Sequence, residues 1–191
     1  MQTNGPFPHF SGRPLPLANV YAGFNQLKRL YRQGWLRRGL NPEQCESVAD
    51  HIFGVALLTL LLADAYFPAC DNARAVRMAL LHEVGEIEVG DLIPGDGHTN
   101  AEKHQREKSA ARRIFAGLEQ GEEYLNLWEE FEAGQTFEAR LVRQVDRLEM
   151  ALQARLYQAD GWLNPDEFLA SAAAVIDLPE LQALLAGLEE K

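Results

Sequence analysis

The adjacent pair His82 and Glu83 constrains this chain more than any other feature, because it lies in a largely apolar run, MALLHEVGEIEVGDL. The run has the character of a buried helix, and an imidazole beside a carboxylate is costly to bury unless something binds them. Neutral imidazole and carboxylate together suit a divalent cation such as Mn, Co, Fe or Zn. The pair therefore predicts a fold in which a metal site lies inside a helical core.

Length and composition predict a single all-α domain. A chain of 191 residues is long enough to bury a real core, and 47% hydrophobic with 24% charged residues is ordinary for a globular protein. Leu, Ala, Glu and Arg dominate, and strand-like alternation is hard to find. Residues 1–16 contain four prolines and no sustained periodicity. We therefore expect a flexible N-terminal arm over residues 1–16 and one domain over residues 17–191.

Hydrophobic spacing and capping residues divide the chain into helices. Ser47 and Asp50 form the capping box Ser-x-x-Asp, which begins a helix that is apolar almost all round and should form the centre of the bundle. The apolar stretch of that helix is interrupted by charge before it reaches membrane-spanning length. The expected helices run from Leu17 to Gly34, Ser47 to Leu62, Asp71 to about Val89, Thr99 or Asn100 to Phe115, Tyr124 to Phe131 and Thr136 to about Tyr157, with one or two short helices after Asn164–Pro165.

Two further residues are candidate metal ligands with His82 and Glu83. His51 lies in the first turn or so of the central helix, where a side chain can face a pocket, although a helix-start histidine can also simply bind solvent. Asp146 lies at the edge of the apolar stripe of a later helix, where it could instead pair with a neighbouring arginine. Taken together, two histidines and two carboxylates leave open coordination positions for water, which is typical of a catalytic metal site.

The order of these residues and of the segments around them resembles a known family. The segments, between about residues 31 and 157, are RQGWLRR, ESVADH, ALLHEVGEIEVGDLIPGD, EKHQREKSA, LWEEFE and VDRLEMALQA. They resemble the HD-domain metal-dependent phosphohydrolases, and among these the small 5'-deoxynucleotidase branch. The resemblance implies an HD-domain helical bundle with the metal site between the core helices that begin at Ser47, Asp71 and Thr136. One position departs from the family, which has His-Asp where this chain has His82 and Glu83.

Two acidic residues beyond the pair are candidate catalytic groups. Glu86 follows His82 by four residues, so both can line one helical face, and a carboxylate beside a metal-bound water is placed for general acid/base work. The resemblance implies the same role for Glu86, and it matches Asp91 to a family acid associated with that step. The alternatives are a solvated helix glutamate and a loop aspartate. Glu88 is expected at the surface.

The loop before the central helix is a candidate substrate-binding region. It crowds Arg32, Trp35, Arg37 and Arg38, and an arginine can grip phosphate through two hydrogen bonds while a tryptophan can stack on a base. The resemblance implies that one arginine and Trp35 contact a nucleotide. The spacing to His51 departs from the family, so the arginine stays open between candidates such as Arg32 and Arg38. The alternative is a basic loop with Trp35 as a core anchor.

Two charged segments have weaker assignments. A charged helix face, such as the one carrying Lys103, His104, Arg106 and Glu107, is usually just solvated. Glu149 lies nearer the middle of a buried stripe than Asp146, so it needs a partner such as a ligand histidine or an arginine.

The net charge of −10 opposes binding to nucleic-acid polymers, because that binding depends on neutralising phosphates. With only two cysteines and no evident export signal, we expect reduced thiols and a cytoplasmic protein without membrane attachment. A small anionic ligand remains compatible with this charge, since a bound cation and a few arginines reverse the local field.

The function expected from these residues is hydrolysis of a phosphomonoester, in particular a deoxyribonucleoside 5'-monophosphate, with one divalent cation (Mn, Co, Fe, Zn or Mg) as cofactor. Glu86 would protonate the leaving 5'-oxygen. Two alternatives stay open: an HD hydrolase that acts on another phosphate ester, and a non-enzymatic metal- or nucleotide-binding protein, which the departure at Glu83 keeps in play. A homodimer is expected only from the resemblance.

Overall fold

The protein is described by a computed structural model that places residues 16–92 and 97–189. Within these residues the chain is helical without strands, and a single antiparallel bridge joins Tyr31 to Ser47. The predicted all-α class is therefore confirmed. The predicted N-terminal arm lies outside the described residues except for Pro16. The elements are α1 Pro16–Phe24, η1 Leu27–Arg29, α2 Gln33–Leu36, α3 Val48–Tyr66, α4 Asn72–Leu81, α5 Glu86–Val89, α6 Asn100–Phe115, α7 Gly121–Ala133, α8 Phe137–Ala159, α9 Asp166–Ala173 and α10 Pro179–Glu189.

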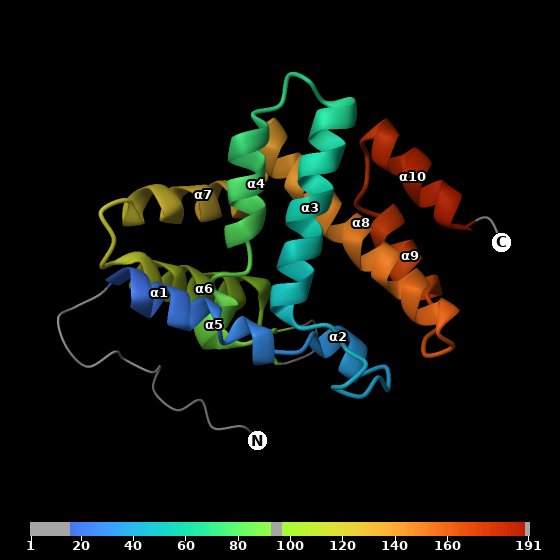
Figure 1. The fold of residues 1–191 in the computed structure, drawn as a ribbon, viewed down its shortest axis with the longest axis horizontal. Coiled ribbons are helices and arrows are strands. Elements are labelled where there is room, and N and C mark those ends of the chain that lie inside the picture. Colours follow the sequence, from blue (N-terminus) through green and yellow to red (C-terminus); the bar gives the residue numbers. More distant parts are fainter. Residues whose placement is uncertain (1–15, 93–96, 190–191) are drawn as a thin grey trace.

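Helix α3 stands at the centre of the bundle and packs against α4 and α8, with α8 crossing behind it (Figure 1). Helices α6 and α7 pack together on one side, and α9 and α10 pack on α8 at the other. Three clusters of buried apolar side chains fill the spaces between these layers. The first lies among α3, α4 and α8, the second under α6, and the third around Trp35.

The beginning of α3 is fixed by the predicted capping box. The Ser47 hydroxyl accepts a hydrogen bond from the Asp50 backbone N–H at 3.2 Å, and the Asp50 carboxylate accepts from the Ser47 backbone N–H at 2.9 Å. Both bonds satisfy backbone donors that have no partner within the helix. The cap sets the start of α3 and, with it, the position of His51 one turn later.

The single helix predicted from Leu17 to Gly34 is wrong, because the chain there forms α1, η1 and α2 instead. Leu30 has an extended backbone, and its carbonyl accepts a hydrogen bond from the Val48 N–H at 2.7 Å. The next residue, Tyr31, forms the bridge to Ser47. Pairing with the segment before α3 therefore replaces the helical bonds, and it brings the Arg32 backbone beside Glu46.

The helix predicted from Asp71 to about Val89 is also two helices, and the break falls on the His82–Glu83 pair. Residues 82–85 form a turn in which the N–H groups of Val84 and Glu86 bond to carbonyls three residues earlier rather than four. Two backbone carbonyl groups at this break accept hydrogen bonds from side chains instead of from helix N–H groups. The His82 carbonyl accepts the Trp128 indole N–H at 3.2 Å, and the Ala79 carbonyl accepts from His82 Nδ1 at 2.6 Å.

Helix α3 is the one described helix with the length and composition to cross a membrane. Its apolar character has a structural cause, since one face is buried against α4 and α8. The expectation that α3 forms the centre of the bundle is thus confirmed on that face. The opposite face keeps a stripe of exposed apolar side chains at helical spacing: Phe53, Leu57, Leu60 and Leu61.

Candidate metal centre and active site

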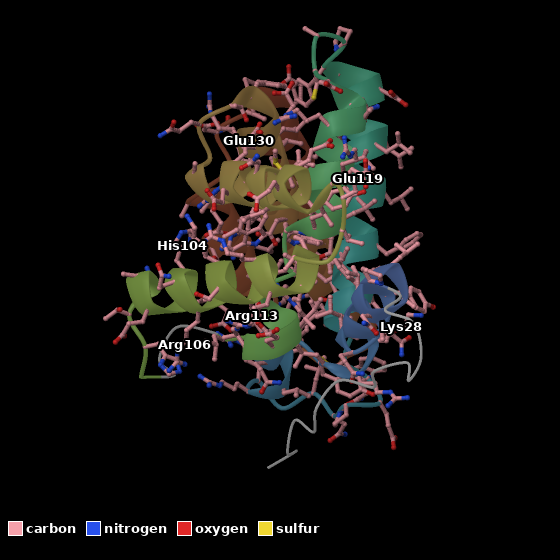
Figure 2. The ribbon with its side chains drawn as sticks, turned by 90° about the vertical axis from the view of Figure 1, so that its left-hand side faces the viewer. Lys28, His104, Arg106, Arg113, Glu119 and Glu130 are labelled. Carbon is pink, nitrogen blue, oxygen red and sulfur yellow. The ribbon has the colours of Figure 1, made fainter. Side chains whose placement is uncertain are left out.

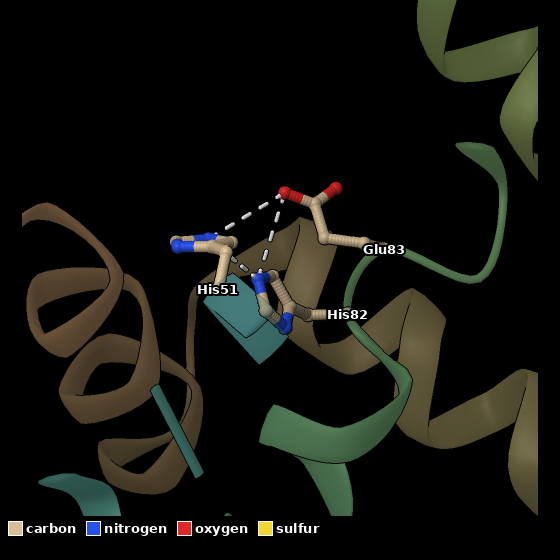
Figure 3. A group of neighbouring side chains, drawn as sticks. All are labelled: His51, His82 and Glu83. Carbon is tan, nitrogen blue, oxygen red and sulfur yellow. Dashed lines mark hydrogen bonds and ion pairs between the residues drawn. The ribbon is translucent and has the colours of Figure 1, made fainter. Parts of the chain in front are cut away.

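Three separate segments carry the four predicted metal ligands. His51 is fully buried in the first turn of α3, His82 and Glu83 occupy the turn after α4, and Asp146 lies in the middle of α8. Because α3 packs against both α4 and α8, residues far apart in the sequence meet at one point. The two imidazole rings and the Glu83 carboxylate point toward one another (Figure 3).

The inward-facing atoms of His51, His82 and Glu83 lie within 4.8 Å of one another, and Asp146 lies against His51. His51 Nε2 lies 3.4 Å from His82 Nε2 and 3.1 Å from an Asp146 carboxylate oxygen. Glu83 Oε1 lies 3.6 Å from His82 Nε2 and 3.9 Å from His51 Nε2. The longer glutamate arm therefore reaches the histidine pair from its position in the turn.

The remaining ring nitrogens are occupied by other partners, which fixes the direction of both imidazoles. His51 Nδ1 is 2.6 Å from a Glu149 carboxylate oxygen, and His82 Nδ1 is 2.6 Å from the Ala79 carbonyl. If each imidazole carries a single proton on Nδ1, both Nε2 atoms present lone pairs inward. A bound cation would then take the place of the second proton that the neighbouring carboxylates favour on His51. Two nitrogens bound to one ion at about 2.1 Å would lie about 3.4 Å apart in tetrahedral geometry, so the donor set suits a divalent cation.

The charges around the histidines favour positive charge between them. Burial and the Arg32 charge oppose protonation of His51, yet its hydrogen bonds to Asp146 and Glu149 raise its pKa to about 10. Burial also opposes ionisation of Asp146, but the bond to His51 outweighs it and holds the pKa of Asp146 below its usual range. The negative charge of these carboxylates would also stabilise a bound cation.

Glu86 begins α5 and faces the same centre. Its side chain is 2% exposed, its Oε2 has no hydrogen-bond partner, and its Oε1 lies 3.9 Å from the Lys103 ammonium. Burial raises its pKa well above the usual value, and the nearby carboxylates of Glu83 and Asp91 raise it further. The raised pKa favours the protonated form of this carboxyl group, which is the form that an acid catalyst needs.

Asp91 is buried just beyond α5, and both of its oxygens face the predicted substrate loop. One oxygen accepts the Gln33 backbone N–H at 2.6 Å, and the other lies 3.8 Å from the Arg32 guanidinium. Arg32 also donates to Glu83 Oε1 at 3.2 Å. Arg32 thus bridges a predicted ligand and a predicted catalytic acid.

A cavity of about 600 Å³ opens beside the centre. It contains all three predicted substrate-binding residues, and Asp91 lies in its wall. Arg147, which follows the predicted ligand Asp146, adds another cation to the lining. The lining residues are Arg32, Gly34, Trp35, Arg37, Arg38, Asp91, Arg147, Met150, Glu167, Phe168 and Ser171.

Trp35 and Arg38 are both held by neighbours in the wall of this cavity. Trp35 is 2% exposed, its indole N–H donates to Glu46 at 2.7 Å, and its ring packs 4.3 Å from the Phe168 ring. This packing is that of a core anchor, so stacking of Trp35 on a base stays a prediction. Arg38 pairs with Glu167 and lies over the Phe168 ring at 4.9 Å.

A family model for the HD domain matches residues 24–182 of the chain. The chain belongs to the HD-domain family. This match covers every predicted ligand, both predicted acids and the cavity residues of α2 and α9.

Individual relatives agree with this assignment. The chain is 39% identical over 172 residues to 5'-deoxynucleotidase HDDC2 of Danio rerio, covering 87% of this HD-domain chain and 82% of the relative. A conserved hypothetical protein from Pyrococcus furiosus superimposes with a TM-score of 0.76 at 30% identity, over 90% of this chain and 98% of that one. A protein described as a predicted metal-dependent phosphohydrolase from Magnetospirillum magnetotacticum gives 0.68 at 29%, over 91% of each chain.

Helix α6 of this HD domain is only partly the solvated face that its charge predicted. Arg106 is exposed and, like Arg113, lies on the outer surface, and His104 pairs with Glu132 (Figure 2). Lys103 instead turns inward, donating to the Leu92 carbonyl at 2.8 Å. The buried carboxyl of Glu107 lies 3.5 Å from the same ammonium.

Several residues of the HD-domain site had no recognisable signal in the sequence. Glu46 precedes the helix cap and carries no periodicity, yet it binds Trp35 and lies near His51 and Glu149. The cavity residues of α9 come from a short helix to which the sequence attached no chemistry. Glu149 was expected to need a buried partner, and the structure supplies His51.

Proposed function

We propose that this HD domain is a metal-dependent phosphohydrolase that removes phosphate from nucleoside 5'-monophosphates, with deoxyribonucleotides as the favoured substrates. The observation that carries the proposal is the grouping of His51, His82 and Glu83, with Asp146 against His51, beside the buried Glu86 and an arginine-lined cavity. The substrate class is supported by relatives such as the zebrafish protein, whose name is 5'-deoxynucleotidase.

His51, His82, Glu83 and Asp146 would hold one divalent cation, for which Mn, Co, Fe, Zn and Mg are the candidates. Such a cation supplies Lewis acidity toward the phosphoryl oxygens and lowers the pKa of water. Four converging ligands fit a single ion better than the paired ions, about 3.5–4 Å apart, of two-metal phosphodiesterases. The geometry therefore favours a phosphomonoester over a diester.

The arginines of the cavity bind the phosphate. Arg32 and Arg147 lie at its inner side, 3.2 Å from Glu83 and 3.9 Å from Asp146, respectively. A guanidinium there can form two parallel hydrogen bonds with a phosphate. Asp91 fixes the Arg32 side chain from the other side. Arg38, farther out and paired with Glu167, would contact the nucleoside part.

Glu86 provides the proton that the leaving group needs. As the water oxygen bonds to phosphorus and the bond from phosphorus to the 5'-oxygen breaks, negative charge develops on that 5'-oxygen. The raised pKa of Glu86 favours its protonated form, and donation of this proton yields the free 5'-hydroxyl. The proton that the attacking water releases then restores the acid form of Glu86. The buried position keeps the proton from exchanging freely with solvent.

A phosphate-release screen tests the proposal. The chelator-treated protein would be assayed with deoxyribo- and ribonucleoside monophosphates, nucleoside triphosphates and a phosphodiester, each with Mn, Co, Mg or Zn restored. We expect metal-dependent release from the 5'-monophosphates. Release from triphosphates or diesters alone would assign a different HD hydrolase activity. No release with any metal that binds would assign a non-enzymatic nucleotide-binding role.

The domain bounds and partners are proposals as well. Residues 17–191 would form one domain, which is supported by the packing of α10, a helix that extends past the end of the family match, on α8 and α9. A homodimer would cover the exposed α3 stripe, in which Phe53 is 68% and Leu61 54% exposed. Light scattering of wild type and Phe53→Glu tests this.

Both cysteines are free thiols, which supports a cytoplasmic location.

A further inference from the structure

A line of neighbouring polar side chains runs behind His51, away from the predicted metal. His51 Nδ1 meets a Glu149 oxygen at 2.6 Å, and the Glu149 side chain is 9% exposed. The carboxylate of Glu46 lies within 4.8 Å of the ligand atoms of both residues. Glu46 in turn accepts the Trp35 indole N–H at 2.7 Å. The line therefore leads from a metal ligand to the wall of the substrate cavity.

Glu46 is anchored at both ends of its backbone. Its N–H donates to the Tyr157 hydroxyl at 2.9 Å, and its carbonyl accepts the Arg32 N–H at 3.2 Å. The residue is thus joined to two cavity residues, Arg32 through the main chain and Trp35 through the side chain. A carboxylate fixed in this way has little freedom to leave Glu149.

Helix α3 leaves room for the Glu149 carboxylate next to its own ligand. Gly54 follows His51 by three residues, and a Cβ at position 54 would lie 2.6 Å from Glu149 Oε1 and 3.1 Å from its Cγ. Real Cβ atoms essentially never show a contact as short as 2.6 Å, so a side chain at position 54 would displace the Glu149 carboxylate. The glycine makes the bond between Glu149 and His51 sterically feasible.

The position of the two carboxylates suits the orientation of a metal ligand. The Glu149 carboxylate lies 2.6 Å from His51 Nδ1, as in the carboxylate–histidine pairs that orient metal ligands in other proteins. The Glu46 carboxylate lies within 4.8 Å of the ligand atoms of both residues and also accepts from Trp35.

We propose that Glu46 and Glu149 are positioning residues that hold His51 with Nε2 toward the metal and tie that ligand to Trp35 in the substrate cavity. The inference rests on the proposed metal-dependent function. It assigns the carboxylate pair no contact with substrate. It predicts that metal affinity depends on residues of the cavity wall, even when no nucleotide is present.

Cobalt binding to the purified full chain tests the proposal, because the visible absorption of Co²⁺ reports ligand geometry without substrate. We expect Glu149→Ala to weaken Co²⁺ binding by about 10- to 100-fold, the range for lost outer partners of metal ligands. Glu46→Ala should weaken it by about tenfold and alter the Co²⁺ spectrum. Glu46→Gln, which can both donate and accept, should restore most of the affinity and the wild-type spectrum.

Gly54→Ala offers an independent perturbation, because it displaces Glu149 without removing either carboxylate. It should weaken Co²⁺ binding like Glu149→Ala. Gly187→Ala is the matched control, since a Cβ there meets nothing within 4 Å, and it should leave binding unchanged. Wild-type affinity in Glu46→Ala and Gly54→Ala, with folding verified by circular dichroism, would overturn the proposal.

A double-mutant cycle tests the connection to the cavity wall. Trp35→Phe removes the indole N–H, and it should weaken Co²⁺ binding in the wild type but have little effect in Glu46→Ala. Equal effects in both backgrounds would show that Trp35 acts independently and would overturn the connection. If the wild type itself binds no Co²⁺, the proposed function fails. Normal binding without these mutational effects defeats only the present inference.

Discussion

The two sides of the site differ in how completely their polar atoms are paired. On the His51 side, the Nε2 atom of His51 faces Asp146 and His82, and its Nδ1 atom faces the Glu149 carboxylate. On the Glu86 side, Glu86 Oε2 and Glu107 Oε1 are buried without a hydrogen bond. The same small region thus contains a nearly saturated half and a half with unmet hydrogen bonds.

This difference assigns different tasks to the two halves. A saturated network is rigid and holds its atoms at fixed distances, which a metal site requires. Burial raises the pKa of a carboxyl group that has few hydrogen bonds, and a carboxyl group with a raised pKa can hold and pass on a proton. The burial of Glu86 and Glu107 raises both pKa values. This contrast fits the proposed roles, in which one half binds a cation and the other holds and delivers a proton.

Removing a ligand should have the largest effect. His82→Ala deletes one of the two inward imidazoles, so we expect loss of bound metal and of metal-dependent hydrolysis together. Elemental analysis after reconstitution measures the first, with one ion per chain expected in the wild type. A variant that keeps its metal would show that the saturated half is not the metal site.

Removing the proton donor should separate the two halves. Glu86→Ala should leave the metal content near that of the wild type and lower turnover by about 10²- to 10⁴-fold, the range for a positioned acid or base. Phosphate release under saturating metal and substrate measures the loss. Glu88, which is partly buried and pairs with Arg113, provides the control substitution Glu88→Ala. Equal turnover in the two variants would remove Glu86 from the mechanism.

Shortening the unusual ligand sharpens the comparison within the saturated half. Glu83→Asp restores the His-Asp pair of the family but withdraws the carboxylate by one methylene. Glu83 Oε1 now reaches both histidines and Arg32, so we expect the shorter arm to lose these contacts and metal affinity to fall by about tenfold or more. A gain in both affinity and phosphate release would identify the native glutamate as an impaired ligand and favour a non-enzymatic role.

The last prediction concerns the free energy of unfolding rather than metal binding or turnover. Burial raises the pKa of Glu107 to about 7 from 4.5, so the folded chain keeps a proton that the unfolded chain releases in this window. The free energy of unfolding should therefore fall as pH rises from about 4.5 to 7. Glu107→Gln removes this dependence and should gain up to about 3 kcal/mol over the wild type at pH 8. Urea denaturation of both proteins at pH 5 and 8 measures the difference.

The fold was largely predictable because helices leave local signals. The caps at Ser47, Thr99 and Thr136 each lie where the sequence placed them, since a cap depends on residues within one turn. The two wrong helices failed for non-local reasons. The pairing of Tyr31 with Ser47, and the hydrogen bond from Trp128 to the His82 carbonyl, both join distant segments that no local pattern links.

The site was predictable only where chemistry is unusual in its context. Histidines and acids stand out in apolar helices, so the sequence alone was enough to select His51, His82, Glu86 and Glu149. It was not enough for Glu46 and Lys103, because charged residues beside a cap or on a polar helix are ordinary. Their importance comes from the tertiary packing that turns them inward.

The proposed ligands come from three segments: helix α3, the turn that follows α4, and helix α8. The unfolded chain does not bring these segments together. A cation bound by all four side chains would act as a reversible cross-link between three helices. By mass action it stabilises only the folded state, by about 4 kcal/mol when its concentration is a thousand times the dissociation constant. The melting temperature would then depend on metal supply, so an apo protein in a metal-poor cell would be both inactive and more easily unfolded and degraded.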